Sequence, residues 1–214
     1  MKLTALLLTV SLGLAAKTGA RADTIVFATN PTGGAGNAGG YGTAGTPFHV
    51  GAGGATIHAL GYFDPMAYWG LNQSGLSTAH NVGIYDASET LLCSVLVPSG
   101  PGVTLHDGTR WVALSGDVPL PGDADYMLAF TIAPFANDFL VGAAGQVTIG
   151  SGFSLRGSGW TVSMVPGPEL HYPGLSTTGT SYIFGGNMET PEPGCLALGT
   201  LGLALLLVSR RRRR

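Results

Sequence analysis

The body of the chain consists of short runs in which apolar residues occupy every second position. Between residues 126 and 133, for example, Leu128, Phe130 and Ile132 alternate with smaller or more polar residues. This alternation places the apolar side chains on one face of a strand. No window of the body shows a period of 3.6 residues over a dozen positions, so the pattern indicates an all-β protein.

Turn residues separate these runs, as at Pro98-Ser99-Gly100, Asp107-Gly108 and Pro121-Gly122-Asp123. Many short strands with one polar face favour an antiparallel β-sandwich, jelly-roll-like in form. A body of about 170 residues suits one domain, which we expect over residues 46–187. The predicted strands span residues 23–29, 55–63, 80–86, 90–97, 110–114, 126–133, 147–149, 152–155, 160–165 and 181–184.

Residues 30–45 consist almost entirely of glycine, alanine, asparagine and threonine. Such a run buries little apolar surface. We therefore predict that residues 23–45 form a first strand followed by a mobile, Gly-rich loop. The glycines are not a phosphate-binding loop, because no lysine and no helical pattern follow them.

The C-terminal end contains three elements in a fixed order. Pro191-Glu192-Pro193 comes first, an apolar run over residues 195–208 follows, and five arginines close the chain. Positive flanks stay on the cytoplasmic side of a membrane, so the body is expected on the other side. As a helix the run is only about 21 Å long, a short span for a core of about 30 Å. The topology residues are Arg210, Arg211, Arg212, Arg213 and Arg214.

The N-terminal end predicts export independently. Lys2 precedes an apolar stretch over residues 3–16, and Ala20 and Ala22 fit the small-x-small rule for signal cleavage. We expect residues 1–22 to be a signal peptide with a helical apolar segment, cut before Asp23. An uncleaved first helix and an ordinary single-pass anchor at the other end are the alternatives.

The C-terminal order resembles the PEP-CTERM sorting domain of Gram-negative bacteria over residues 188–214. The resemblance implies that an exosortase-type membrane enzyme recognises Pro191, Glu192 and Pro193 and processes the tail. It further implies an intermediate anchored in the inner membrane by a transmembrane helix, and then a protein at the cell surface or in an extracellular, polysaccharide-rich biofilm matrix.

A second resemblance covers about residues 55–135. It rests on His80-Asn81-Val82-Gly83-Ile84-Tyr85-Asp86 and on Leu91-Leu92-Cys93-Ser94. This segment is similar to a sandwich domain of unknown function in exported bacterial proteins, so it implies a β-sandwich and no known chemistry. In this chain the turn at residues 87–89 lacks the glycine expected there.

The charge of the mature body excludes one class of partner. Between Asp23 and Thr190 the chain has two cations, Arg110 and Arg156, and eleven carboxylates, so its formal net charge is −9. Affinity for nucleic acid depends on cations that neutralise phosphates. We therefore expect no nucleic-acid partner, whereas a neutral extracellular polysaccharide is compatible with this charge.

The residues that usually carry catalysis occur here without a catalytic pattern. The five histidines show no metal-ligand spacing, and a structural, hydrogen-bonded role is expected for His80. Cys93 lies in an apolar alternating run, which indicates a buried structural thiol rather than a nucleophile. We therefore predict a non-enzymatic protein, with a polysaccharide hydrolase that uses two turn carboxylates as the remote alternative.

Two weaker site predictions remain. Asp123 and Asp125 stand two residues apart in an acidic turn, where both carboxylates could face a calcium ion; we expect no other cofactor. Tyr68 and Trp69 lie in an expected loop, where aromatic rings could stack on a sugar as in a carbohydrate-binding module. For both pairs the plainer alternative is structural: solvated acidic turn residues and aromatic rings at the edge of the core.

Overall fold

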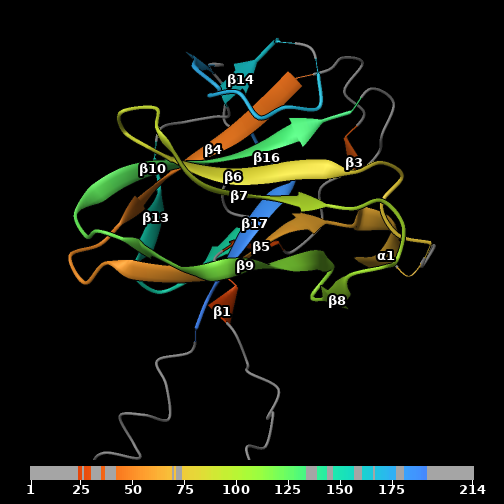
Figure 1. The fold of residues 1–214 in the computed structure, drawn as a ribbon, viewed down its shortest axis with the longest axis horizontal. Helices are drawn as coiled ribbons and strands as arrows, with labels where there is room; N and C mark the ends of the chain where they lie inside the picture. The colour runs from red at the N-terminus through yellow and green to blue at the C-terminus, as the bar shows by residue number, and fades with distance from the viewer. Residues whose placement is uncertain are drawn as a thin grey trace, which may run out of the picture.

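Two antiparallel sheets pack face to face in this protein, as the ribbon in Figure 1 shows. The computed structural model describes residues 24–25, 27–29, 35–36, 42–68, 70, 74–133, 139–143, 147–156, 161–165, 167–176 and 181–191. Over these residues the chain is mostly strand, with one four-residue helix, α1 (Pro65–Tyr68). The all-β sandwich predicted from the alternating pattern is therefore confirmed.

The first sheet has the strand order β1-β17-β5-β9-β8. The long strands β5 and β9 pair along most of their length, with a register shift between Ile57 and Ala59. The bounds are β1 (Thr24–Ile25), β5 (Ala55–Phe63), β8 (Thr104–His106), β9 (Thr109–Leu120) and β17 (Gly186–Thr190).

The second sheet has the order β15-β14-β4-β10-β6-β7, and β13 also pairs with β4. Strand β7 is an edge strand of this sheet. It packs against β9, so it lies on the same side of the sandwich as β9 and β8 of the first sheet. The bounds are β4 (Gly42–Val50), β6 (His80–Asp86), β7 (Leu91–Val97), β10 (Ala124–Ile132), β13 (Phe153–Leu155), β14 (Thr161–Ser163) and β15 (Leu175–Ser176).

Shorter strands form two further small sheets. In one, β16 (Ser181–Phe184), β11 (Phe139–Ala143) and β3 (Ala35–Gly36) pair in that order; in the other, β12 (Val147–Ile149) pairs with β2 (Phe27–Thr29).

The core lies between the two large sheets. Tyr62 of β5, Phe48 of β4 and Phe130 of β10 are fully buried, and the rings of Tyr62 and Phe130 meet edge to face with centroids 5.8 Å apart. Burying an aromatic side chain of this size contributes about 1.5–3 kcal/mol relative to exposure. The alternating positions read from the sequence thus supply the inner faces of both sheets.

The strand predictions agree with the structure where the alternation is clear. Strands β5, β6, β12 and β16 have the predicted bounds, and β7 and β10 differ from theirs by one or two residues. Strand β9 continues six residues beyond the predicted 110–114. The strands that were not predicted are β3, β4, β8, β11, β15 and β17.

The prediction of a mobile loop was wrong for residues 42–45, which begin β4. This strand lies between β14 and β10 inside the second sheet. Its residues are small because both faces are covered: Ala44 faces the core, and a Cβ on Gly45 would lie 2.5 Å from the Pro173 ring and 2.6 Å from Met127 Sδ. Strand β4 therefore starts at Gly42, and β17 reaches Thr190, beyond the predicted 46–187 at both ends.

The turn between β6 and β7 closes without a glycine. Glu89 takes a φ of 63°, a left-handed conformation that costs a non-glycine residue roughly 1 kcal/mol. Asp86 compensates, because its Oδ1 accepts hydrogen bonds from the backbone N–H groups of Ser88 and Thr90, both at 2.9 Å. The side chain of Asp86 thus holds the turn that glycine would otherwise ease.

We expect Glu89→Gly to stabilise the fold by about 0.5–1 kcal/mol, because glycine adopts the left-handed conformation without strain. Ala87→Gly is the matched control: Ala87 is exposed in the same turn without a positive φ, so its replacement is neutral or destabilising. Chemical denaturation of both variants measures the difference. A Glu89→Gly variant no more stable than the parent would contradict this account of the turn.

Candidate functional site

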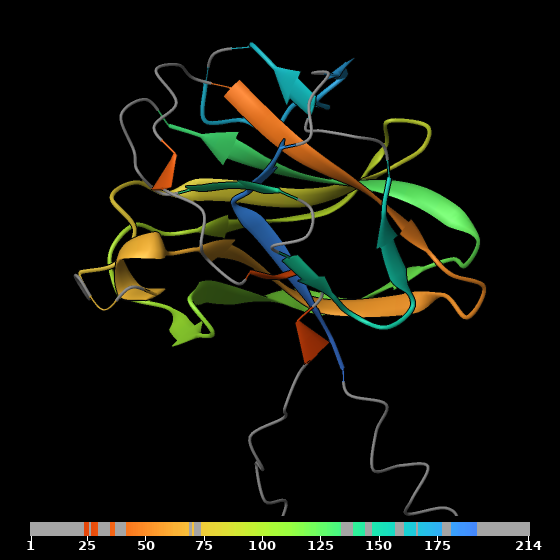
Figure 2. The ribbon, with the colours of Figure 1, turned by 180° about the vertical axis from the view of Figure 1, so that it is seen from behind.

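The two ends of the described body meet at one end of the first sheet. Thr24 of β1 pairs with Thr190 of β17, and Pro191 follows directly. Figure 2 shows β17 running down the rear of the molecule to the end at which β1 lies. The N-terminal and C-terminal extensions are therefore attached side by side.

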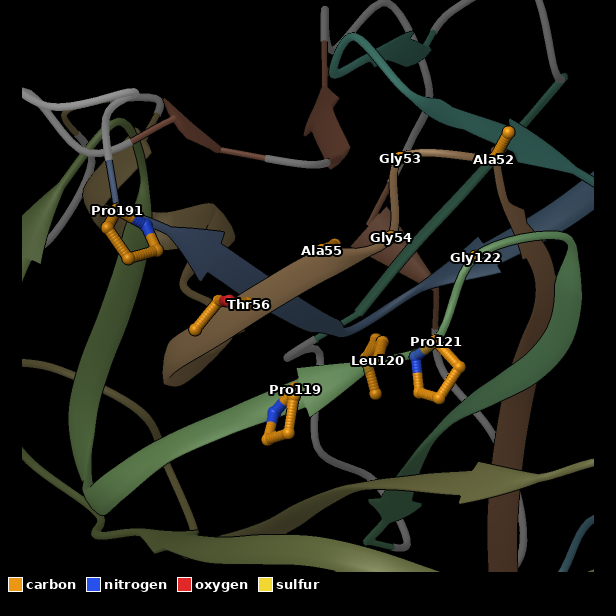
Figure 3. Close-up of a pocket in the computed structure, with 10 residues that line it drawn as sticks. All are labelled: Ala52, Gly53, Gly54, Ala55, Thr56, Pro119, Leu120, Pro121, Gly122 and Pro191. Atoms are coloured by element: carbon orange, nitrogen blue, oxygen red, sulfur yellow. The ribbon is translucent and has the colours of Figure 1, made fainter. Parts of the chain in front are cut away.

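Pro191 lines a pocket of about 720 Å³ that is open to solvent. The other lining residues come from the turn between β4 and β5, the start of β5, the end of β9 and the turn that follows β9, as Figure 3 shows. The two turns pack backbone against backbone, because a Cβ on Gly122 would lie 2.4 Å from the Ala52 carbonyl oxygen. No charged side chain lines this pocket, so it offers shape and backbone groups rather than acid–base chemistry.

A second cluster brings two histidines to a buried carboxylate. His106 Nε2 lies 2.5 Å from Glu189 Oε1, and His58 Nε2 lies 3.5 Å from Glu189 Oε2. The Glu189 side chain is 4% exposed, whereas that of His106 is 38% exposed. The ring of His106 also stacks on Trp111, with centroids 5.3 Å apart. Sequence reasoning missed this cluster, because β5, β8 and β17 each supply one member and sequence spacing carries no trace of it.

A third cluster lies on the surface of the second sheet. Register pairs Asp125 of β10 with His49 of β4, and Asp125 Oδ1 lies 2.6 Å from His49 Nδ1 and 2.9 Å from Arg156 Nε. His49 Nδ1 also lies 2.9 Å from Arg156 Nη2, so the three side chains form one hydrogen-bonded cluster. These hydrogen bonds, that of His49 foremost and then that of Arg156, lower the pKa of Asp125 from its usual 3.8.

This cluster bears on the predicted calcium pair. Asp125 is engaged by His49 and Arg156, while Asp123 lies in the turn before β10 with a φ of 54°. Within the described residues, no group of three or more His, Cys, Asp or Glu side chains is arranged to hold a metal ion. A calcium ion at Asp123 and Asp125 would have to displace His49 and Arg156 from Asp125, and the calcium pair stays a prediction.

A buried ion pair fixes the helix that carries Tyr68. Arg110 Nε donates to Asp64 Oδ2 at 2.7 Å, and both side chains are at most 3% exposed. Asp64 Oδ1 in turn accepts from the backbone N–H of Ala67 at 3.0 Å, in the first turn of α1. One of the body's two cations is thus used inside the fold. Trp69 lies outside the described residues, and the glycan contact of Tyr68 and Trp69 stays a prediction.

The structural role predicted for His80 is confirmed. Its ring is 1% exposed and stacks on Tyr62, with centroids 3.8 Å apart. Nδ1 donates to the Thr131 carbonyl oxygen at 2.9 Å, so Nε2 is left to accept from the Thr78 hydroxyl at 3.2 Å. Both ring nitrogens are therefore engaged in holding strands together.

Cys93 also behaves as the alternating pattern indicated. Its side chain is half-buried against the core, and burial raises the pKa of the thiol to about 11, against a smaller opposing effect of a hydrogen bond with the Ile84 backbone. The nucleophilic form is the thiolate, so Cys93 is a poor nucleophile near neutral pH.

Several predicted site residues lie outside the described residues: Ala20 and Ala22 of the signal, Glu192 and Pro193 of the motif, and the five arginines from Arg210 to Arg214. In the part of the chain that is described, no helix has the length and apolar character needed to cross a bilayer.

Comparison with known proteins identified no relative of this chain. No protein-family model matches the chain, and no similar protein was found among curated proteins.

We expect the Asp125 carboxyl to titrate below 3.8, and His49→Gln to move its pKa up by more than Arg156→Gln does. A lowered pKa in the folded state contributes stability above the unfolded value, and this contribution is lost as the pH falls through the folded value. The effect on stability is below about 1 kcal/mol, because the pair is exposed.

An NMR pH titration of the Asp125 carboxyl carbon measures these shifts. His171→Gln is the control, since His171 makes no part of this cluster and its replacement leaves the titration of Asp125 unchanged. A pKa at or above 3.8 in the parent protein would refute the hydrogen-bonded arrangement of His49, Asp125 and Arg156.

We expect Cys93 to react with an uncharged thiol reagent at pH 8 about 100-fold more slowly in the native than in the unfolded protein, because little thiolate forms. The measurement uses a Cys195→Ser chain with and without denaturant. In a Cys93→Ser background, Ser94→Cys provides an exposed neighbour that reacts quickly. Equal native rates at positions 93 and 94 are the outcome that this description of the thiol excludes.

Proposed function

We propose that this chain is an exported, non-enzymatic protein of the cell surface or extracellular matrix. Its signal peptide carries it across the inner membrane, and its tail is sorted in the manner of PEP-CTERM proteins. The support is the order of three elements at the C-terminal end: Pro191-Glu192-Pro193, the apolar run and the arginine block. Each element has a physical role in holding and orienting a chain across a bilayer.

The observation that carries the proposal is where the strands begin and end. Strand β1 begins at Thr24, one residue after the predicted signal cut, and β17 ends at Thr190, immediately before the motif. Cleavage before Asp23 and near Pro191 to Pro193 would therefore remove both extensions without removing any residue of these strands. A protein that is cut twice and then remains folded needs cut positions of this kind.

The arrangement of charged groups supports a non-catalytic body. Asp64 binds Arg110, Asp125 binds His49 and Arg156, and Glu189 lies between His58 and His106. The carboxylates of Asp64 and Glu189 are at most 4% exposed and therefore out of reach of a substrate, whereas Asp125 lies at the surface with its partners. An acidic body with its cations engaged in this way suits a surrounding of neutral polysaccharide.

The partner in this proposal is an exosortase-type membrane enzyme that reaches the motif beside the end of the first sheet. Since the motif follows β17 without a linker, the enzyme would work close to the folded domain. The open pocket lined by Pro191, Thr56 and Pro121 lies at this end of the sheet, next to the chain that the enzyme must grip.

Replacing Pro191, Glu192 and Pro193 together by alanine tests the proposal in the producing organism. We expect the full-length chain to accumulate in the membrane fraction, while the parent protein is recovered from the surface as a shorter species by intact-mass measurement. Pro119→Ala with Pro121→Ala is the matched control, since it alters prolines of the same pocket and leaves the motif intact. Processing that is unchanged in the triple variant would overturn the sorting role.

A further inference from the structure

The outer edge of β7 has no strand partner among the described residues and borders a groove of about 440 Å³ between β7 and β9. Strand β7 ends the second sheet, and among the described strands it pairs only with β6. The ladder between the two strands is regular from Cys93 to Val97, since the register shift lies before it. A row of backbone donors and acceptors therefore faces away from the sheet, where it can accept another strand.

Apart from the register shift at Leu92, β7 has none of the usual protection against pairing. It reads Leu-Leu-Cys-Ser-Val-Leu-Val, without a charge, a proline or a glycine. Natural edge strands usually carry charged residues, prolines or bulges that block the approach of a second strand. In a body with a net charge of −9, seven uncharged residues with high β-propensity are a marked departure.

The side chains around this edge are apolar and exposed. Leu91, Leu92 and Leu96 are 43%, 37% and 56% exposed, and Leu105 on β8, the edge strand of the first sheet, is 38% exposed. They account for four of the six large hydrophobic side chains that are exposed in the described residues. A strip of this kind marks an interaction surface.

We propose that β7 is a self-association edge, at which two copies of this chain pair their β7 strands antiparallel about a two-fold axis through Ser94. The segment is complementary to itself in this register. Leu92 lies opposite Leu96 of the second copy, and Cys93 lies opposite Val95. Small Ser94 meets its own counterpart on the axis, so every other pair is apolar.

Charge favours the antiparallel arrangement over the parallel one. The turn before β7 carries Asp86 and Glu89. In a parallel pair these carboxylates would lie beside their own counterparts, and like charges directly opposite one another destabilise a sheet. In the antiparallel pair they lie at opposite ends of the interface, next to residues 98–100 of the second copy, which carry no charge.

The contact also continues an apolar surface that already exists. Tyr85, Met127 and Ala129 form a small cluster on the outer face of the second sheet, with Leu170 and Tyr172 packed against it. Leu91 reaches the edge of this cluster, because its Cδ1 would lie 3.0 Å from a Cβ on Gly83, beside Leu170. A paired β7 therefore extends a covered face rather than creating an isolated contact.

The pairing is expected to be weak and dependent on salt. Seven-residue strands bury an area at the low end of specific interfaces, which begin at about 1,200 Å² in total. Two bodies of net charge −9 repel each other, and salt screens this repulsion. We expect association to increase with protein concentration and with ionic strength, as suits a protein crowded at a surface.

Sedimentation velocity on the full chain in detergent, at low and at high salt, tests the proposal with one charge variant and its control. Leu96→Lys places a cation on the edge and is expected to weaken dimer formation at least about tenfold. Met164→Lys is the control. It places a cation at an exposed position beside β14, where Met164 is 68% exposed, and is expected to leave the dimer unchanged. Adding Leu92→Glu to Leu96→Lys restores pairing, because the two positions face each other across the axis.

Cross-linking tests the register itself. In a chain with Cys93→Ser and Cys195→Ser, Ser94→Cys is expected to form a disulfide-linked dimer on oxidation, since position 94 lies on the axis. Leu92→Cys alone, and Gly53→Cys in the turn between β4 and β5, are expected to remain monomeric. Three results would overturn the proposal: a parent chain that is monomeric at high salt, a dimer that survives Leu96→Lys, and equal cross-linking at positions 53 and 94.

Discussion

The sandwich depends on one buried polar contact between its two sheets. Tyr62 of the first sheet stacks on His80 of the second. The backbone carbonyl oxygen of Thr131 accepts hydrogen bonds from His80 Nδ1 at 2.9 Å and from the Tyr62 hydroxyl at 3.5 Å. Unsatisfied polar groups in such a place would cost roughly 1–3 kcal/mol each. Each of these polar atoms has its partner only in one register of β5, β6 and β10. This contact therefore fixes how the apolar faces of the two sheets pack together.

The scarce cations of the body are used to hold the fold together. Arg110 neutralises Asp64 inside the protein, and Arg156 binds Asp125 across three strands of the second sheet. Breaking a buried pair such as the first by removing one partner costs about 3–5 kcal/mol, because a buried charge is left behind. The surface of the body therefore has almost no free positive charge. The uncharged, leucine-rich strand β7 stands out on this acidic surface.

Strands were predictable from sequence where large and small residues alternate, as in β5, β6 and β10. Prediction failed where packing rather than alternation decides. The small residues of β4 resemble a loop until Met127, Pro173 and the core cover both of its faces, and the second half of β9 lacks a clear alternation. The clusters of His58, His106 and Glu189, and of His49, Asp125 and Arg156, could not be predicted, because their members lie on separate strands.

By itself the sequence determined the class of fold, the acidic character of the body and the two terminal patterns on which the sorting proposal rests. These properties are local: alternation, charge and the order of segments can be read without knowing which residues meet. Only the tertiary structure decided that Thr24 pairs with Thr190, that the two cations are held by carboxylates, and that β7 ends its sheet. Those facts depend on strand order and register, which arise from contacts between residues far apart in the chain.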